Sequence, residues 1–557
     1  MKLRHLLFGL LAGVAFVACT NDNEPAGVTP VKGGNEVAAT KYMAINFVMP
    51  GDATTRADGG FVVGTTAENK VEKGVLFFFD GETQVADPFI LGGEGSNALE
   101  GTKLTWSDST GNVEKKSSTI IVLSNPLKEP KSVLAVLNAD LTDLGLSKNS
   151  TLSEIKAVVG DYAKDKTAEG KFVMSNSVYQ EDVTSPVTVV YDTVEEAIAA
   201  ETPSAEIYVE RVVAKVNVGY ADPLVTNLAN TDKPSNTVVI DGEEVELTAD
   251  IQGWWLDNTV DKSFLLKKLP ASTDLDAANH RSYWAGSIPT DAKFQHYAFG
   301  TATTADKYVQ ENVDLKNTTK VVVAAILKAN GKPLQLVKHL TNLYTESGFV
   351  TAAINVLAHK YWVVDKEKST DTKVEYRTVG EGDFKFTYIF SQVEGEGEAA
   401  TTKYYTLVNG TKTEVTIPEG VEIPALKSYE AYTLIEIADP QETFYVKDDT
   451  TESGYAQKDP TADLKGYIVQ KWNDGMAYYF VPIEHKIGGN YTAGTGVIRN
   501  HFYKVTVNSI NGLGTPVPFK DDDTIIPIKP DETAKYISAT INILSWKAVT
   551  QDVNLGK

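Results

Sequence analysis

Residues 536–555 read YISATINILSWKAVTQDVNL, and their first half decides how the chain is interpreted. A period of two places alternate side chains on one face of a β-strand. The apolar face of this strand consists of Ile537, Ala539, Ile541 and Ile543. The preceding residues, 519–532, are rich in Asp and Pro, which is typical of an exposed connector. A half-apolar strand on a polar connector must join a sheet, either in its own domain or in another molecule.

A second strand of the same kind is predicted near the amino end, at residues 41–50 (KYMAINFVMP). Its apolar face consists of Met43, Ile45, Phe47 and Met49. The following residues, 51–60, have the composition of a loop and contain one arginine, Arg56, as a ready protease site. We hypothesise that the first strand holds a groove until it is cut away, and that the carboxyl-terminal strand fills the same groove in a neighbouring molecule.

Other interpretations of these stretches stay open. Without the flanking strands, Arg56 would pass for an ordinary loop arginine, and Lys41 and Lys70 also offer basic cleavage sites. The tail could complete its own domain instead of entering a neighbour.

Length and composition limit the class of protein. A chain of 557 residues implies more than one domain. Its net charge of −22 argues against nucleic acid and against an anionic membrane surface as partners. The single cysteine, Cys19, rules out a disulfide within the chain.

Cys19 closes a segment that resembles a secretory signal. A basic start at residues 1–4 precedes the apolar residues 6–17, and this arrangement is typical of a bacterial lipoprotein signal with Cys19 as the lipidated residue. An ordinary signal peptide with an incidental cysteine is the alternative. Residues 20–35 have the composition of a disordered tether. No other stretch is long and apolar enough to span a bilayer.

The remainder of the chain is strand-rich, which favours β-sandwiches over a parallel sheet. Residues 207–218 (IYVERVVAKVNV) are predicted to form one long strand. Helices are predicted at 149–162, 194–200 and 347–357, the first two with capping boxes that begin at Thr151 and Thr193. A hairpin is predicted across Asn409 and Gly410.

Residue patterns of known catalytic sites are lacking in the sequence. It has no HExxH, GxSxG, phosphate loop or Cys/His cluster, so we expect no enzyme, no cofactor and no metal site. The acidic residues are numerous enough that a glycosidase pair is not excluded by count alone. Trp254 and Trp255 could stack on sugars, although adjacent strand aromatics more often face core and surface in turn.

Several of these stretches, in this order, resemble the Mfa-type fimbrillins, the pilus subunits of Bacteroides-like bacteria. The most specific is MAYYFVPIEH at 476–485, followed by GVIRNHFYKVTVNSINGLG at 496–514. Weaker matches are VLAVLN at 133–138, FVMSNS at 172–177, VERVVAKVNV at 209–218 and GWWL at 253–256. Residues 274–457 match no motif of the family.

The resemblance implies an all-β fold with minor helices: two transthyretin-like Greek-key β-sandwich domains and a carboxyl-terminal donor strand. It implies the following division: signal peptide 1–19, removable propeptide 20–56, domains 57–219 and 220–520, and linker with donor strand 521–557. It also implies a precursor lipoprotein at the outer membrane, which an Arg-specific protease cuts between Arg56 and Ala57. The processed chain would polymerise head to tail in a surface fimbria, together with tip and anchor subunits.

Two hypotheses from different classes follow. The first is a structural pilus subunit that polymerises by strand exchange and supports adhesion and biofilm formation, with a shaft or adaptor role. The second is a surface-retained glycan-binding lipoprotein. A retained lipoprotein needs neither a detachable strand nor a donor tail, so the tail and Arg56 discriminate between them.

Overall fold

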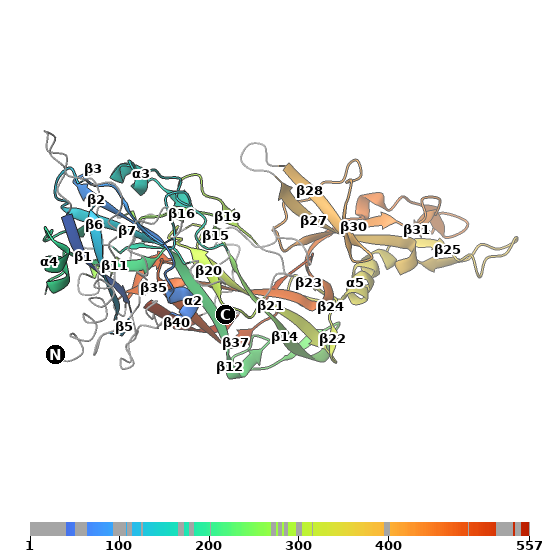
Figure 1. The fold of residues 1–557 in the computed structure, drawn as a ribbon. Helices are drawn as coiled ribbons and strands as arrows, with labels where there is room; N and C mark the ends of the chain where they lie inside the picture. The colour runs from blue at the N-terminus through green and yellow to red at the C-terminus, as the bar shows by residue number, and fades with distance from the viewer. Residues whose placement is uncertain are drawn as a thin grey trace.

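The structure is a computed structural model. It describes residues 41–50, 64–92, 107–108, 114–123, 126–164, 172–177, 183–200, 202–268, 275–276, 281–282, 288–296, 303–314, 316–394, 401–487, 490–519, 538–540 and 547–555. The predicted all-β fold with minor helices is confirmed. Figure 1 shows a ten-stranded sheet toward one end of the molecule and a small four-stranded sheet at the other.

The ten-stranded sheet contains the amino-terminal strand β1. Along the sheet, the order is β3-β2-β7-β9-β11-β1-β6-β5, with β4 on β2 and β10 on β7. The strands are β1 (Lys41–Pro50), β2 (Gly74–Asp80), β3 (Thr83–Gln84), β4 (Phe89–Leu91), β5 (Ser107–Asp108), β6 (Glu114–Leu123), β7 (Ser132–Leu137), β9 (Met174–Asn176), β10 (Ser185–Pro186) and β11 (Ala205–Arg211). One side of the sheet covers a core in which Phe77, Leu134 and Ile207 are fully buried.

The chain leaves this sheet at Val212, so the prediction of one long strand at 207–218 is wrong. β11 ends at Arg211 and β12 (Val213–Asn227) begins a second sheet. The Val212 amide donates to the carbonyl of Val173, which ties the break to the first sheet. The second sheet has the order β20-β12-β37-β40-β39. Its other strands are β20 (Lys307–Gln310), β37 (His501–Asn511), β39 (Ser538–Thr540) and β40 (Lys547–Leu555).

A thirteen-stranded sheet packs against the second sheet. Its order is β29-β28-β27-β30-β33-β23-β24-β13-β14-β21-β34-β38, with β22 on β21. The strands are β13 (Thr237–Ile240), β14 (Glu243–Asp257), β21 (Lys320–Ala329), β22 (Lys332–Pro333), β23 (Leu336–His339), β24 (Asn342–Thr345), β27 (Phe384–Glu394), β28 (Thr401–Val408), β29 (Thr411–Glu414), β30 (Ala431–Ile437), β33 (Tyr467–Trp472), β34 (Met476–Pro482) and β38 (Thr515–Pro516).

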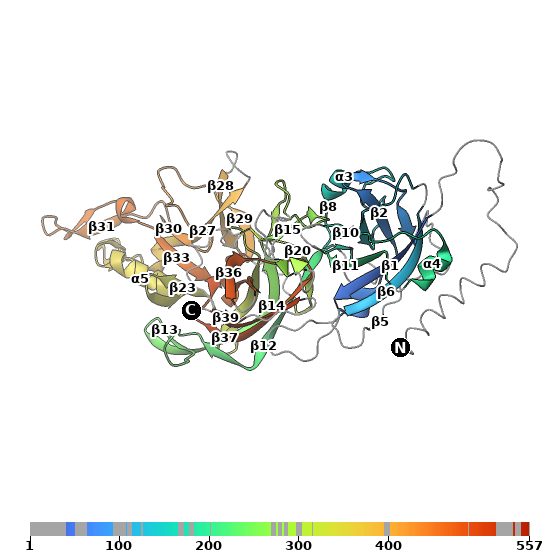
Figure 2. The ribbon, with the colours of Figure 1, turned by 90° about the vertical axis from the view of Figure 1, so that its left-hand side faces the viewer.

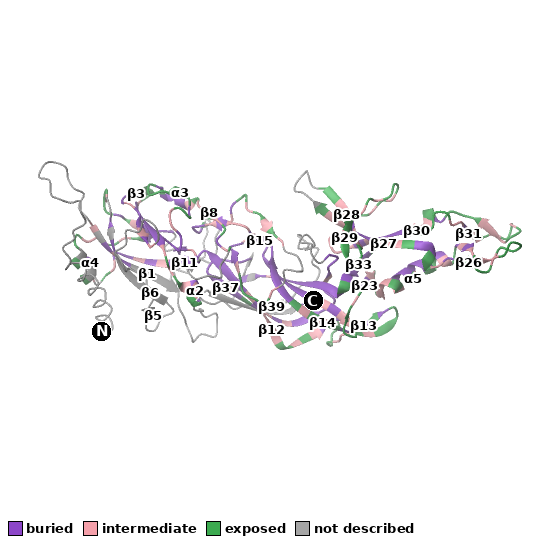
Figure 3. Ribbon diagram, turned by 45° about the vertical axis from the view of Figure 1, so that its right-hand side comes forward, coloured by how far each residue is buried: buried purple, intermediate pink, exposed green. Residues whose placement is uncertain are grey.

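The central strands of this sheet are covered on both faces, as the buried positions in Figure 3 show. Trp254 joins the core shared with β12 and β37, whereas Trp255 joins a second core with Tyr478. Both tryptophans are buried, so the sugar-stacking interpretation is wrong and neither side chain faces the surface. Sequence alternation is preserved here, but the opposite face is a second core rather than solvent.

The four-stranded sheet lies beside α5. Its order is β26-β25-β31-β32, formed by β25 (Trp362–Val364), β26 (Tyr376–Thr378), β31 (Phe444–Lys447) and β32 (Tyr455–Gln457). Val363 and Phe444 pack with Val350 and Ile354 of α5 in a separate core. The remaining short pairs are β8 (Val159–Gly160) with β16 (Ser263–Phe264), β15 (Thr259–Val260) with β19 (Phe294–Gln295), β17 (Leu275–Asp276) with β18 (Arg281–Ser282), and β35 (Glu484–Ile487) with β36 (Asn490–Thr495).

The described α-helices are short, and three of them begin at a capping box. They are α2 (Thr66–Asn69), α3 (Leu152–Lys156), α4 (Val194–Ala199) and α5 (Glu346–Ala358). The predicted capping boxes at Thr151 and Thr193 are confirmed, although α3 is shorter than expected because Val159 enters β8. The hairpin across Asn409 and Gly410 is also confirmed, with both residues at positive φ as a type I′ turn requires.

The first and second sheets meet at a buried polar junction. Leu265 and Leu266, which follow β16, pack into the core of the first sheet. Arg499 donates to the carbonyls of Leu265 and Phe264 at 2.7 Å each. Its guanidinium also pairs with Glu311 at 3.0 Å, and both side chains are 0% exposed. The junction is therefore held by a fully buried ion pair as well as by apolar contacts.

We expect Glu311→Gln to lower the free energy of unfolding by about 3–5 kcal/mol, because it leaves Arg499 buried without its counter-charge. Urea denaturation measures this. Glu414→Gln is the matched control, since Glu414 forms a long, exposed pair with Lys403 and should change stability by less than about 1 kcal/mol. Equal effects of the two substitutions would contradict the account of the junction.

Candidate strand-exchange site

The predicted amino-terminal strand forms β1 and lies in the interior of the ten-stranded sheet. It pairs antiparallel with β6 from Lys41↔Leu123 to Pro50↔Glu114, and parallel with β11 from Ile45↔Ala205 to Val48↔Tyr208. Figure 2 shows β1 beside these two strands. β1 alone separates β6 from β11, so both of its edges form ladder hydrogen bonds.

The apolar face of β1 enters the core, as predicted for Met43 and Ile45, which are both 0% exposed. The side chains of Phe47 and Met49 lie outside the described residues. We call the space that β1 occupies the β1 groove. Its lining, which is buried in the same core, includes Ile121, Leu123, Ala205 and Ile207. Sequence reasoning did not identify these lining residues, although their alternation within STIIVL (118–123) and AEIYVE (205–210) was the available signal.

Polar contacts fasten the amino end of β1. The Ala44 amide donates to the Ser204 hydroxyl at 2.9 Å, and the Ser204 amide donates to the Ala44 carbonyl at 2.7 Å. Lys41 donates to Asp192 at 2.5 Å and lies 3.6 Å from Glu129. The hydrogen bond with Asp192 raises the pKa of the Lys41 ammonium.

The described part of the carboxyl tail folds back on its own sheet. β40 pairs parallel with β37, from His501↔Lys547 to Ile510↔Leu555, and β39 pairs antiparallel with β40. Leu555 is fully buried in the core of this sheet. Ala539 lies in β39, at the outer edge, whereas Ile537, Ile541 and Ile543 lie outside the described residues. This arrangement corresponds to the alternative in which the tail completes its own domain.

Three predicted processing residues, Cys19, Arg56 and Ala57, also lie outside the described residues. Arg56 falls in the stretch that joins β1 to α2. Among the helices that the structure describes, none has the length and apolar character needed to cross a bilayer.

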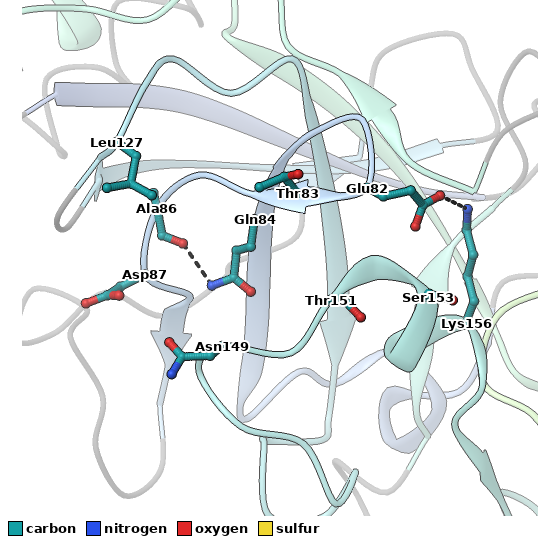
Figure 4. A pocket seen from close by; sticks show the side chains of 10 residues that line it. All are labelled: Glu82, Thr83, Gln84, Ala86, Asp87, Leu127, Asn149, Thr151, Ser153 and Lys156. Carbon is teal, nitrogen blue, oxygen red and sulfur yellow. Dashed lines mark hydrogen bonds and ion pairs between the residues drawn. The ribbon is translucent and has the colours of Figure 1, made fainter.

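The first sheet also carries a hollow on its surface (Figure 4). Its lining is largely polar, with Gln84 bonded to the Ala86 carbonyl and Lys156 3.3 Å from Glu82. Leu127 at its rim is 82% exposed. Across the described ranges, no three His, Cys, Asp or Glu side chains lie close enough together to hold a metal ion. The residues that line the hollow therefore form no such cluster.

Comparison with protein families matches residues 470–552 to the carboxyl-terminal region of fimbrillin, the major fimbrial subunit protein type IV. The resemblance to fimbrillins is confirmed over these residues. The matched segment begins within β33 and ends within β40, so it includes β37, the strand with which β40 pairs. No curated protein matches the chain.

Solved structures with low similarity include a fimbrial assembly protein from Parabacteroides distasonis, at 10% identity and a TM-score of 0.28, covering 68% of this chain and 99% of that one. A candidate cell adhesion protein from the same species has 11% identity and a TM-score of 0.33, covering 93% and 100%. Another from Bacteroides eggerthii has 13% identity and a TM-score of 0.28, covering 54% and 80%. These overall superpositions are too loose to support residue-level conclusions.

We expect Ile45→Ala to lower the free energy of unfolding of the uncut chain by about 2–4 kcal/mol, because it leaves a cavity in the β1 groove. Thermal or urea denaturation measures this. The control is Val356→Ala on α5, where the side chain is 65% exposed and a change below about 0.5 kcal/mol is expected. If Ile45→Ala were as mild as the control, β1 would not hold the core together.

Proposed function

We propose that this protein is a structural subunit of a surface fimbria, made as a lipid-anchored precursor. Proteolysis after Arg56 releases β1, and the carboxyl-terminal donor strand of another copy then fills the β1 groove. The observation that carries this proposal is the interior position of β1 between β6 and β11. The fimbrillin match at residues 470–552 supports the same function.

Chain connectivity makes β1 removable. β1 is the first of the described strands, so one cut within residues 51–63 ends its covalent link to the other described strands of the sheet. Departure of β1 would leave β6 and β11 about 10 Å apart, since neighbouring strands are about 4.8 Å apart. Each would then present unpaired N–H and C=O groups, which are a template for an incoming strand.

Energetics explain why the cut must come first. Ladder hydrogen bonds contribute about 0.5–1.5 kcal/mol each, and a buried large apolar side chain contributes about 1.5–3 kcal/mol. A bound strand is therefore stabilised by on the order of 10 kcal/mol before the cost of ordering it. While β1 is attached, its effective concentration exceeds that of any external strand. The cut removes this advantage and permits exchange.

The positions of the basic residues favour Arg56 as the processing site. The chain contains Arg4, Arg56, Arg211, Arg281, Arg377 and Arg499. Arg211 and Arg499 are buried, and Arg377 forms a bidentate ion pair with Asp383. Lys41, an alternative site, lies in β1 and pairs with Leu123 of β6. Arg56 instead occurs in a stretch with loop composition.

Removal of residues 1–56 would also remove Cys19 and the lipid anchor, which suits a subunit that leaves the outer membrane for a fimbrial shaft or adaptor. Its partners would be copies of itself, tip and anchor subunits, and an Arg-specific protease. The role is structural and not enzymatic. In the precursor, β40 would stay paired with β37 of its own sheet until a partner groove opens.

The test is polymerisation of the soluble chain from residue 20 after treatment with an Arg-specific protease. We expect a ladder on an unboiled gel, because an inserted strand resists dissociation. Arg56→Lys should remain monomeric with this protease yet form the ladder after trypsin, which also cuts at lysine. The new amino end is checked by mass.

A second sample lacks residues 536–557 and should be cut normally but stay monomeric. A protein that is cut at Arg56, retains its tail and still does not polymerise would contradict the proposal. Glycan binding by a retained lipoprotein would then be the better explanation.

A further inference from the structure

α2, which follows the proposed cut, occupies a buried polar site between the first and second sheets. Glu68 is 1% exposed, and its carboxylate accepts from Lys215 at 2.9 Å and from the Tyr308 hydroxyl at 2.5 Å. Arg211 donates from Nε to the Glu68 carbonyl at 3.0 Å and also to the Asn69 side chain. The site therefore holds the segment through both side chains and backbone.

The walls of this site come from both sheets. Arg211 ends β11, whereas Lys215 and Tyr308 belong to β12 and β20. Asn500, which precedes β37, accepts from Arg211 Nη1 at 3.0 Å. One short segment, through Glu68 and Asn69, thus bridges the sheet that contains the β1 groove and the sheet that carries the tail.

The chemistry of the site selects a buried glutamate side chain. Two buried cations, Arg211 and Lys215, face the segment, and Lys215 also pairs with Asp306 at 2.9 Å. Burial alone raises the pKa of Glu68, but the Tyr308 hydrogen bond and the charges of Lys215 and Arg211 outweigh it, so the net pKa is lowered. The carboxylate therefore stays charged and keeps its partners down to acidic pH.

A capping box fixes the shape of the segment within this site. Thr65 and Glu68 form a capping box, in which the Thr65 amide donates to Glu68 Oε2 at 2.6 Å. At Gly64, a Cβ would lie 2.7 Å from Arg211 Nη2 and 2.6 Å from Asn69 Oδ1, so a side chain there would displace the contact. Glycine at position 64 leaves room for the ends of these two side chains to meet.

We propose that this junction is a binding site for a peptide that presents one glutamate, residues 64–70 of the chain itself, which stays bound after β1 leaves. This inference rests on the proposed function, because it defines where the removable part ends. A cut after Arg56 leaves the segment in place. A cut after Lys70, another basic site, would end the covalent link between the segment and the remainder of the protein, which we call the body. Arg211 and Lys215 would then lose the Glu68 carboxylate if the segment dissociated.

The test gives the Arg-specific protease a second site through Lys70→Arg in the soluble full-length chain. After digestion, the body is separated by native size exclusion and analysed by denaturing mass spectrometry. We expect residues 57–70 to remain with the body, either uncut at position 70 or as a bound peptide. Loss of residues 57–70 from the body of this variant, in which Glu68, Arg211 and Lys215 are unchanged, would overturn the proposal.

Adding Glu68→Gln to Lys70→Arg should increase the rate of peptide loss more than about tenfold, because it removes the charge that compensates two buried cations. Glu72→Gln is the matched control, since the Glu72 side chain is exposed and its carboxylate pairs with Lys70 rather than with Arg211 or Lys215. If Glu68→Gln prevents folding, Asn69→Ala removes one Arg211 contact and should give a smaller increase. Equal rates in all variants would overturn the proposal.

An unboiled gel of the same digests separates this inference from the proposed function. Retention of residues 57–70 without a ladder contradicts strand exchange alone. A ladder together with rapid loss of the peptide contradicts only the inference that residues 64–70 stay bound.

Discussion

The structure depends on one constraint: β1 is an interior strand, so its backbone is paired on both sides and its apolar face closes a core. An edge strand can leave a sheet at the cost of one ladder, but departure of β1 breaks the ladders with β6 and β11 together. If β1 left, another strand would have to take its place, because the unpaired backbone edges of β6 and β11 and a row of buried apolar side chains would otherwise face water. Removal of β1 would therefore strongly favour the binding of another strand.

The permanent parts of the molecule are fastened differently from β1. Buried ion pairs, Arg499 with Glu311 and Lys215 with Glu68, join segments that are far apart in sequence at the junction of the two sheets. Such pairs are costly to break singly, because the remaining charge stays buried. β1 is instead held chiefly by backbone pairing and apolar contact, which an incoming strand of similar pattern would reproduce. Under the proposed function, this difference would allow one strand to be exchanged without loosening the junction.

Local signals in the sequence predicted local structure well. The capping boxes at Thr151 and Thr193 and the turn at Asn409 each depend on residues a few positions apart, and all three form. Features set by distant residues were not predictable. The apolar positions of residues 207–218 change phase at the break, from 207 and 209 to 212, 214, 216 and 218, but the sheet that each half joins depends on distant strands. Likewise, Trp255 is covered by a core from another part of the chain, and the groove lining comes from β6 and β11. The alternation of β1 predicted Met43 and Ile45 as core residues but not the strands on either side.

The most direct measurement is cross-linking between subunits, because the chain from residue 20 contains no cysteine. Two differently tagged populations carry Ala205→Cys in the β1 groove or Ala539→Cys in the tail, and a short bifunctional maleimide joins them. Ala539→Cys with Val356→Cys on the exposed face of α5 is the control pair. The account predicts a cross-link between the two tags at Ala205, absent before the cut at Arg56 and absent from the control. No link at Ala205 after a complete cut, or equal linking in the control, would contradict strand exchange into the β1 groove.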